Sequence, residues 1–429
     1  MPQPWTRRQF LGQAATGGAA AGMLLAGWSA AEEAAAESRV VVGVMGLSRG
    51  SSLAASFASH AGVEVRYLCD TDSIRAAGVA ESFAKKTGHT PQVVGDFRKI
   101  LDDPGVHALI CAAPNHWHAP ATILACSAGK HVYVEKPCCH NPREGELMVE
   151  AARKYRRAVQ MGSQRRSCPD VREAIRKLHD GIIGRVYLAR SCYAAARTAI
   201  GRGKPADVPS QLDYELWQGP APRRPYLDNR IPYNWHWFWH WGNGELGNNG
   251  VHTLDLCRFG LQVDFPIRVS SSGGRFHFAD DQETPDTQTV CLDFDGRKQM
   301  IWEGRSCNRH RADFVVFYGD QGTLEVEDDG SYAVFDAQDK RIEEHKSNSI
   351  GDQEHIANFL AAIRQDKPLE LNAEILDGFK STLLCHLGNI AYRTGRVLKC
   401  DPANGHILDD PDAMKLWSRE YESGWEPKV

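Results

Sequence analysis

The chain has 429 residues, with 50 Lys and Arg against 54 Asp and Glu, which gives a formal net charge of −4. A hydrophobic content of 42% is ordinary for a globular protein, and the length favours two domains over one. The sequence has no long basic block, so it gives no electrostatic reason to expect a nucleic acid or an anionic membrane as partner. We expect a small-molecule substrate.

The first 37 residues are typical of a targeting segment. Thr-Arg-Arg-Gln-Phe-Leu at residues 6–11 precedes a weakly apolar stretch, residues 14–31, that is rich in Ala and Gly. This pattern predicts a twin-arginine export signal, and with it a periplasmic or otherwise exported protein. The alternative is a retained membrane anchor, but the polar residues in the stretch favour no stable span after processing.

Residues 38–161 alternate short apolar runs with helical periodicity. The expected strands are Val40–Val44, Val63–Cys69, Ala108–Ala112, His131–Val134 and Ala158–Met161, and the expected helices are Ser73–Lys86, Ala119–Ala128 and Pro142–Tyr155. Strands that are apolar almost throughout are covered on both faces. The segment therefore predicts an α/β domain with a doubly wound parallel sheet of the Rossmann type.

The pattern changes over residues 162–398. A helix (Val171–His179) and a strand (Arg185–Tyr193) precede strands at Thr287–Phe294, Gln299–Glu303, Phe314–Tyr318 and Thr323–Val326, and helices follow at Gln353–Ile363 and Ala373–Tyr392. Consecutive strands joined by short turns indicate a mainly antiparallel open sheet, and hence an α+β domain. For the polar tail, residues 399–429, the sequence supports no structural prediction.

The twelve cysteines run from Cys69 to Cys400 without regular spacing, although an exported chain can carry disulfides. Most of them lie in apolar runs, where a small buried thiol is the better interpretation.

A glycine-rich turn follows the first expected strand and precedes a helical stretch that begins near Leu53. Such a turn lets backbone N–H groups approach a pyrophosphate at a helix N-terminus. The match to the G-x-G-x-x-G pattern is imperfect, because a serine stands where the second glycine would be. The residues that we expect at the cofactor here are Gly46, Ser48, Arg49 and Gly50.

The second expected strand ends at Asp70, close to the spacing at which a carboxylate holds the adenosine ribose hydroxyls. A 2′-phosphate would meet like charge there, so Asp70 favours NAD over NADP. The alternative role of Asp70 is to cap the next helix together with Thr71 and Asp72.

Two further strand ends carry distinctive segments, Ala-Pro-Asn-His-Trp-His at 113–118 and Glu-Lys-Pro at 135–137. With Gly-Ser-Gln-Arg-Arg-Ser at 162–167 and Gly-Val-His-Thr-Leu-Asp at 250–255, they make the chain resemble the glucose–fructose oxidoreductase/inositol dehydrogenase (Gfo/Idh/MocA) family. The resemblance implies that the first loop lines the cofactor, that the Glu contacts the nicotinamide-side ribose and that the Lys acts on the substrate. The cofactor contacts that it implies are Pro114, Asn115, His116, Glu135 and Gln164.

The resemblance makes Lys136 the central catalytic residue. A lysine beside oxidised nicotinamide has its pKa lowered by the positive ring and by burial, so it can accept the proton of an alcohol. The family also places a histidine of the second domain at the substrate hydroxyl, here His252. Where the family often has an aspartate four residues earlier, this chain has Asn248, which can orient a hydroxyl but cannot accept a proton.

The run Trp-His-Trp-Phe-Trp-His-Trp at 235–241 precedes that histidine. Tryptophan faces stack on sugars, which makes Trp235 a candidate substrate contact, although core or subunit packing explains such a run equally well. Arg165 and Tyr193 are further candidates by position alone. His236 and His240 have helical spacing but no compelling third ligand, so we expect no metal site.

We therefore expect an NAD-dependent oxidoreductase that acts on a hydroxyl of a sugar, polyol or glycoside. One alternative is a redox-neutral enzyme with tightly bound NAD, which couples two sugars or cleaves a glycoside through a transient keto sugar. Another is a sugar or nucleotide sensor, which the presence of Lys136 disfavours. We also expect a homo-oligomer, a dimer or a tetramer.

Overall fold

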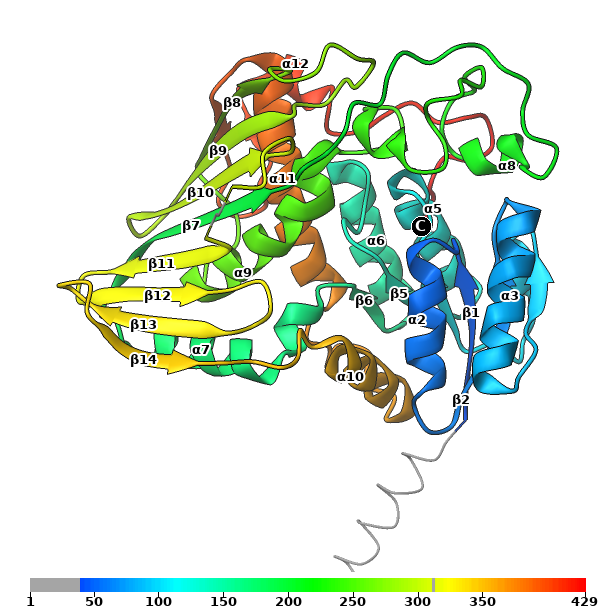
Figure 1. The fold of residues 1–429 in the computed structure, drawn as a ribbon, viewed down its shortest axis with the longest axis horizontal. Coiled ribbons are helices and arrows are strands. Elements are labelled where there is room, and N and C mark those ends of the chain that lie inside the picture. The colour runs from blue at the N-terminus through cyan, green and yellow to red at the C-terminus, as the bar shows by residue number, and fades with distance from the viewer. Residues whose placement is uncertain (1–38, 311–312) are drawn as a thin grey trace, which may run out of the picture.

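A computed structural model of the protein describes residues 39–310 and 313–429. The expected export signal lies outside these residues. Two β-sheets dominate the fold, one formed by the blue to teal N-terminal half and one by the green, yellow and orange C-terminal half (Figure 1). None of the helices in the described ranges is both long and apolar enough to cross a membrane.

The N-terminal sheet has six parallel strands in the order β3-β2-β1-β4-β5-β6. The strands are β1 (Val40–Met45), β2 (Val63–Cys69), β3 (Gln92–Val94), β4 (Ala108–Cys111), β5 (His131–Val134) and β6 (Val159–Met161). Every residue of β1 and β4 is buried, as expected for a sheet with helices on both faces. The order confirms the predicted doubly wound fold. The sequence missed β3 because it is an edge strand, with Gln92 and Val93 exposed.

The helices of this half are α2 (Arg49–Ala58), α3 (Ser73–Thr87), α4 (Arg98–Asp102), α5 (Asn115–Ser127) and α6 (Pro142–Lys154). Helix α5 begins at Asn115, four residues before the predicted start at Ala119. Its first turn contains polar and aromatic residues, and all of them are buried. Tertiary packing therefore sets this helix start, and the hydrophobic periodicity used for the prediction does not record it.

The C-terminal sheet has ten strands in the order β14-β13-β12-β11-β7-β10-β9-β8-β15-β16. They are β7 (Val186–Ala194), β8 (Arg268–Gly274), β9 (Thr287–Phe294), β10 (Lys298–Arg305), β11 (Val315–Gly319), β12 (Gly322–Val326), β13 (Tyr332–Asp336), β14 (Arg341–His345), β15 (Leu398–Cys400) and β16 (Ile407–Leu408). The β7–β10 pair is parallel, while the other pairings for which a register is given are antiparallel. A mainly antiparallel sheet is thus confirmed.

The helical elements of this half are η1 (Gln164–Ser167), α7 (Pro169–His179), α8 (Tyr214–Gln218), η2 (Asn234–Trp237), η3 (Leu246–Gly250), α9 (Val251–Leu261), α10 (Asp352–Arg364), α11 (Ile375–Thr394) and α12 (Pro411–Met414). Of these, η3 is a π-helical turn that leads directly into α9. The tail, residues 399–429, for which we made no structural prediction, contributes the end of β15 together with β16 and α12. All twelve cysteines are free thiols, and all except Cys291 and Cys307 are buried.

The two halves of the chain are interlocked. Helix α10 lies in the segment expected to form the second domain, yet Phe359 packs edge-on against Phe57 and Tyr133 of the first, with ring centroids 6.2 and 5.9 Å away. The red C-terminal segment runs back to α5 (Figure 1), where the ring centroids of Trp425 and Trp117 lie 5.0 Å apart. Residues of the C-terminal half therefore pack against the helices and strands on both faces of the parallel sheet.

Candidate active site

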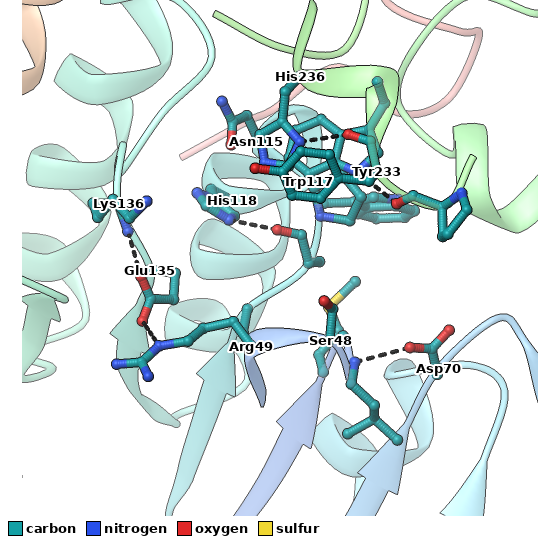
Figure 2. Close-up of a pocket in the computed structure, with 18 of the residues that line it drawn as sticks. Ser48, Arg49, Asp70, Asn115, Trp117, His118, Glu135, Lys136, Tyr233 and His236 are labelled. Atoms are coloured by element: carbon teal, nitrogen blue, oxygen red, sulfur yellow. Dashed lines mark hydrogen bonds and ion pairs between the residues drawn. The ribbon is translucent and has the colours of Figure 1, made fainter. Parts of the chain in front are cut away.

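A cavity of about 550 Å³ lies at the carboxyl ends of β1, β2, β4 and β5 and is closed by residues of the C-terminal half. Ligands bind at this edge of doubly wound sheets because the strand-end loops converge there. Figure 2 shows Lys136 and Glu135 on one side of the cavity and Asp70 on the other. Tyr233 and His236, both from the C-terminal half, lie above them.

The glycine-rich turn lines the cavity through Gly46, Ser48 and Arg49. Gly46 has a φ of +84°, and a Cβ there would lie 2.6 Å from the carbonyl oxygen of Ala112, so only glycine fits. Ser48 caps α2 without a side-chain hydrogen bond, which leaves the first N–H groups of that helix available to an anion.

Gly50, which we expected at the cofactor, does not line the cavity. It is buried, and a Cβ added to it would lie 3.0 Å from Cγ1 of Val44. Its role in this structure is close packing of α2 on β1.

Asp70 lines the other end of the cavity and is only 8% exposed. Its Oδ2 accepts a hydrogen bond from the Leu47 N–H at 2.8 Å, and its Oδ1 accepts one from the Asp72 N–H at 2.9 Å. The carboxylate thus fixes the glycine-rich turn and caps its own loop. Arg75, which the sequence reasoning missed, also lines the cavity and lies 3.5 Å from both oxygens.

The loop after β4 divides into residues that face the cavity and one that does not. Pro114 and Asn115 line it, and Asn115 Nδ2 donates to Asn243 Oδ1 at 2.9 Å. His116 does not line the cavity, contrary to our expectation. Its side chain turns away and is fully buried, and Nε2 donates to the carbonyl of Trp217 at 2.9 Å. Burial lowers the pKa of His116 well below its usual value, so the ring is neutral.

Glu135 is held from two sides at the end of β5. Arg49 Nε donates to its Oε1 at 3.1 Å, and the backbone N–H of Lys136 donates to Oε2 at 3.2 Å. A Cβ at Gly162 would lie 3.2 Å from the carboxylate, so a glycine leaves it room. The carboxylate is therefore fixed at the cavity wall.

The Lys136 ammonium reaches the C-terminal half. Nζ donates to the backbone oxygen of Asn248 at 2.7 Å and to its Oδ1 at 3.2 Å. Burial lowers the pKa of Lys136, and the carboxylates of Glu135 and Glu245 partly oppose that shift. Lys136 therefore releases its proton more readily than a solvated lysine does.

His252 lies in the first turn of α9 and also lines the cavity. Burial lowers the pKa of His252 well below its usual value, and the positive charge of Lys136 adds to the effect. The imidazole is therefore neutral and can accept a hydrogen bond. One turn later, Asp255 accepts from Arg166 Nε at 2.9 and 2.8 Å in a buried ion pair that fixes the helix.

Of the remaining predicted substrate and cofactor residues, all but one line the cavity. Gln164, Trp235, Asn248 and Tyr193 line the cavity. Arg165 does not, because its Nη2 donates to the carbonyl of Asp328 at 2.7 Å and its guanidinium lies over Phe314.

The aromatic run serves both of the roles considered. Trp235 and His236 line the cavity with their rings stacked, centroids 3.6 Å apart. Phe238 and Trp241 instead pack in a buried cluster with Trp217. His236 and His240 do not share a site, since they donate to the carbonyls of Tyr233 and Pro222 respectively. Among the described residues, no three His, Cys, Asp or Glu side chains are grouped to hold a metal ion.

The sequence reasoning missed Arg197 and Tyr233, which both line the cavity. Arg197 is paired with the buried Glu245, with N–O distances of 3.1 and 3.2 Å, and donates to the Tyr233 hydroxyl at 2.9 Å. These residues lie in a long irregular segment, where no periodicity or motif signals their convergence.

Models of a known protein family match both halves of the chain. The model described as oxidoreductase family, NAD-binding Rossmann fold, matches residues 38–163, and the one described as oxidoreductase family, C-terminal alpha/beta domain, matches residues 195–427. The chain belongs to the Gfo/Idh/MocA oxidoreductase family. NAD is accordingly the cofactor of the N-terminal domain, and the turn at Gly46 and the carboxylate of Asp70 line the cavity at its strand ends.

Two relatives and one solved structure illustrate the family. Levoglucosan dehydrogenase of Pseudarthrobacter phenanthrenivorans is 29% identical over 38% of this chain and 35% of its own length. A glycosyl hydrolase family 109 protein of Saccharopolyspora erythraea is 29% identical over 44% of this chain and 46% of its own. The alignments thus span less than half of these relatives. An oxidoreductase domain protein from Kribbella flavida shares the fold, with a TM-score of 0.66, 20% identity and coverage of 84% of this chain and 99% of its own.

Replacement of Gly46 by Ala should weaken NADH binding by about tenfold or more, because the left-handed backbone and the contact with Ala112 would displace the turn. Gly95→Ala is the matched control: Gly95 lines the same cavity, but a Cβ there meets nothing within 4 Å. NADH fluorescence titration of both variants measures the difference. Equal affinities would contradict the assignment of this turn.

Proposed function

We propose that this protein is an NAD-dependent oxidoreductase that acts on a hydroxyl of a sugar, polyol or glycoside, with Lys136 as acid and base. The observation that carries the proposal is the position of Lys136 Nζ. It lies in the cavity lined by the nucleotide turn and by Asp70, held by Asn248 and with a lowered pKa. A structural surface lysine would not combine these features.

Each group has a separate task in this proposal. NAD, when bound, accepts or returns a hydride at the substrate carbon. During oxidation, neutral Lys136 takes the hydroxyl proton on Nζ while the C–H electron pair leaves with the hydride. Asn248 orients Nζ through its two acceptors. His252, which is neutral, accepts a hydrogen bond from a neighbouring substrate hydroxyl. In reduction the Lys136 ammonium returns the proton.

The substrate class is supported by the cavity and by a relative. Trp235, His236 and Tyr233 give the C-terminal wall aromatic surfaces, which suit the C–H faces of a sugar ring. Arg197 and Asn249 add polar groups that can bind hydroxyls. The relative named levoglucosan dehydrogenase is, by its name, an enzyme that oxidises a sugar derivative.

A redox-neutral reaction is the second candidate. It is favoured by the relative named a glycosyl hydrolase, which is as similar to this chain as levoglucosan dehydrogenase is, at 29% identity. In that case the same Lys136 would serve a transient oxidation, and the NAD would be regenerated before the product leaves. The two candidates differ in whether reduced nucleotide accumulates.

The proposal predicts a selective loss of chemistry in Lys136→Met. Turnover should fall by about 10²–10⁴-fold, because general base catalysis is lost, while NADH affinity stays within about twofold. Absorbance at 340 nm, recorded with a panel of sugars, polyols and glycosides, measures NADH formation by the parent protein and by the variant. Lys85→Met, on the exposed face of α3, is the control. Sustained NADH formation indicates a dehydrogenase, whereas product without net NADH indicates the redox-neutral reaction. Normal turnover by Lys136→Met would refute the role of Lys136.

The lowered pKa of Lys136 predicts the pH dependence of oxidation. Since the neutral amine is the active form, kcat/KM should rise with pH and level off through a pKa below the usual 10.5 of lysine. Asn248→Asp would place a carboxylate at Nζ and stabilise the ammonium, so the rising limb should shift to higher pH. Asn248→Ala, which adds no charge, is the control. An unshifted profile in Asn248→Asp would show that another group controls the limb.

We propose that the protein is exported through the twin-arginine route, on the basis of residues 6–11. Replacing Arg7 and Arg8 together by Lys should keep the full-length precursor in the cytoplasm, because the route requires the arginine pair. Immunoblots of periplasmic and cytoplasmic fractions compare the variant with the parent chain. Undiminished periplasmic protein in the variant would contradict the proposal.

A further inference from the structure

A second cavity, of about 560 Å³, lies behind the active site. Its walls come from the start of α6, the end of α11, the loop around residues 222–240 and the tail near residue 419. It shares no lining residue with the active-site cavity. Asn243 stands between the two, since its Oδ1 accepts from Asn115 and its Nδ2 donates to the His140 carbonyl, both at 2.9 Å.

Four arginines line this cavity. Arg393 lies over the ring of Trp239, 5.0 Å from its centroid, and the carboxylate of Glu283 attracts its charge. Arg419 uses Nη2 for Glu144 and the His116 carbonyl, whereas its buried Nε and Nη1 have no acceptor. Arg224 is 3.9 Å from Glu283 at its nearest approach. Of these three arginines, Arg419 alone has buried N–H groups without an acceptor, whereas Arg224 and Arg393 are exposed and have no carboxylate at close hydrogen-bonding distance.

The carboxylates near the cavity do not neutralise all of its arginines. Glu420 is the carboxylate that lines the cavity, and Glu144 is already shared by Arg419 and the hydroxyl of Tyr421. Glu283 is shared between Arg224, Arg393 and the backbone N–H of Trp239, so it cannot satisfy both arginines fully. Arg223, the fourth arginine of the lining, is paired with Glu215 outside it. An oxyanion would supply the missing acceptors.

His140 provides a buried hydrogen-bond acceptor that has no donor. His140 is 9% exposed and lines the cavity, and its Nε2 donates to the Trp239 carbonyl at 3.0 Å. Burial and the nearby Arg419 lower the pKa of His140 well below its usual value, so Nδ1 carries a lone pair. That nitrogen has no donor partner. A ligand hydroxyl would satisfy it.

We propose that this second cavity binds a small hydroxylated oxyanion, such as a sugar phosphate or a sugar acid. The anionic group lies at Arg224, Arg393 and Arg419, and a hydroxyl donates to His140. The half-buried ring of Trp239 offers a face for the carbon skeleton. The site is distinct from the proposed catalytic cavity and does not depend on the reaction performed there.

Calorimetric titration of the NAD-loaded full chain tests the site. Glucose 6-phosphate and gluconate are the oxyanion probes, and glucose and inorganic phosphate are the comparison ligands. We use the Lys136→Met background, and repeat it with saturating sugar substrate where one is known, so that binding in the catalytic cavity is separated from binding here. At least one oxyanion probe should bind, more tightly than glucose and inorganic phosphate, and more weakly as salt is raised.

The double variant Arg224→Gln with Arg393→Gln should weaken that binding by about tenfold or more, because both arginines are charge-assisted donors. Both side chains are exposed at the cavity mouth, so unchanged thermal unfolding and NADH affinity verify that the variant folds. Arg185→Gln, which removes an exposed arginine at β7, is the control. Binding of neither probe, equal binding of glucose, equal binding of inorganic phosphate, or full affinity in the double variant would each overturn the proposal.

Discussion

The hydrogen bonds between Lys136 and Asn248 join the two halves of the chain at the place where the chemistry is proposed. Lys136 follows β5 of the parallel sheet, whereas Asn248 lies in the π-helical turn η3. A π-turn disturbs the regular helical hydrogen bonding, so it can direct a carbonyl towards a neighbouring group. Here it supplies the Asn248 oxygen at 2.7 Å from Nζ. The same turn begins α9 and thereby positions His252 in the cavity.

Charge compensation around Lys136 supports the proposed role of its amine as a base. Two guanidinium groups, Arg49 and Arg197, lie in the same cavity, but each is neutralised by its own carboxylate, Glu135 and Glu245. The lysine has no carboxylate of its own within hydrogen-bonding distance of Nζ among the described residues, and Asn248 provides only neutral acceptors. Burial therefore outweighs the more distant carboxylates and lowers the pKa of Lys136.

The sequence predicted the parallel sheet and its strand ends well, because strands buried on both faces are continuously apolar. It missed β3, whose residues are partly exposed, and the early start of α5, where polar residues are buried by tertiary packing. Gly46, Asp70 and Lys136, which the motifs singled out, all line the cavity. They misplaced His116, whose side chain turns away from the cavity, because spacing does not reveal the side of a loop to which each residue points. Arg197 joins the site through long-range folding that no local pattern records.

The interlocking of the two halves has a consequence for the cofactor loop after β4. Its cavity side presents Pro114 and Asn115, but its support comes from behind: Asn243 holds the Asn115 side chain, and Arg419 donates to the His116 carbonyl. The C-terminal tail adds the contact of Trp425 with Trp117. The conformation of this loop is therefore stabilised by residues of the C-terminal half and of the tail. The nucleotide site is therefore a property of the complete chain rather than of the parallel sheet alone, although the motifs that identify it all lie at strand ends of that sheet.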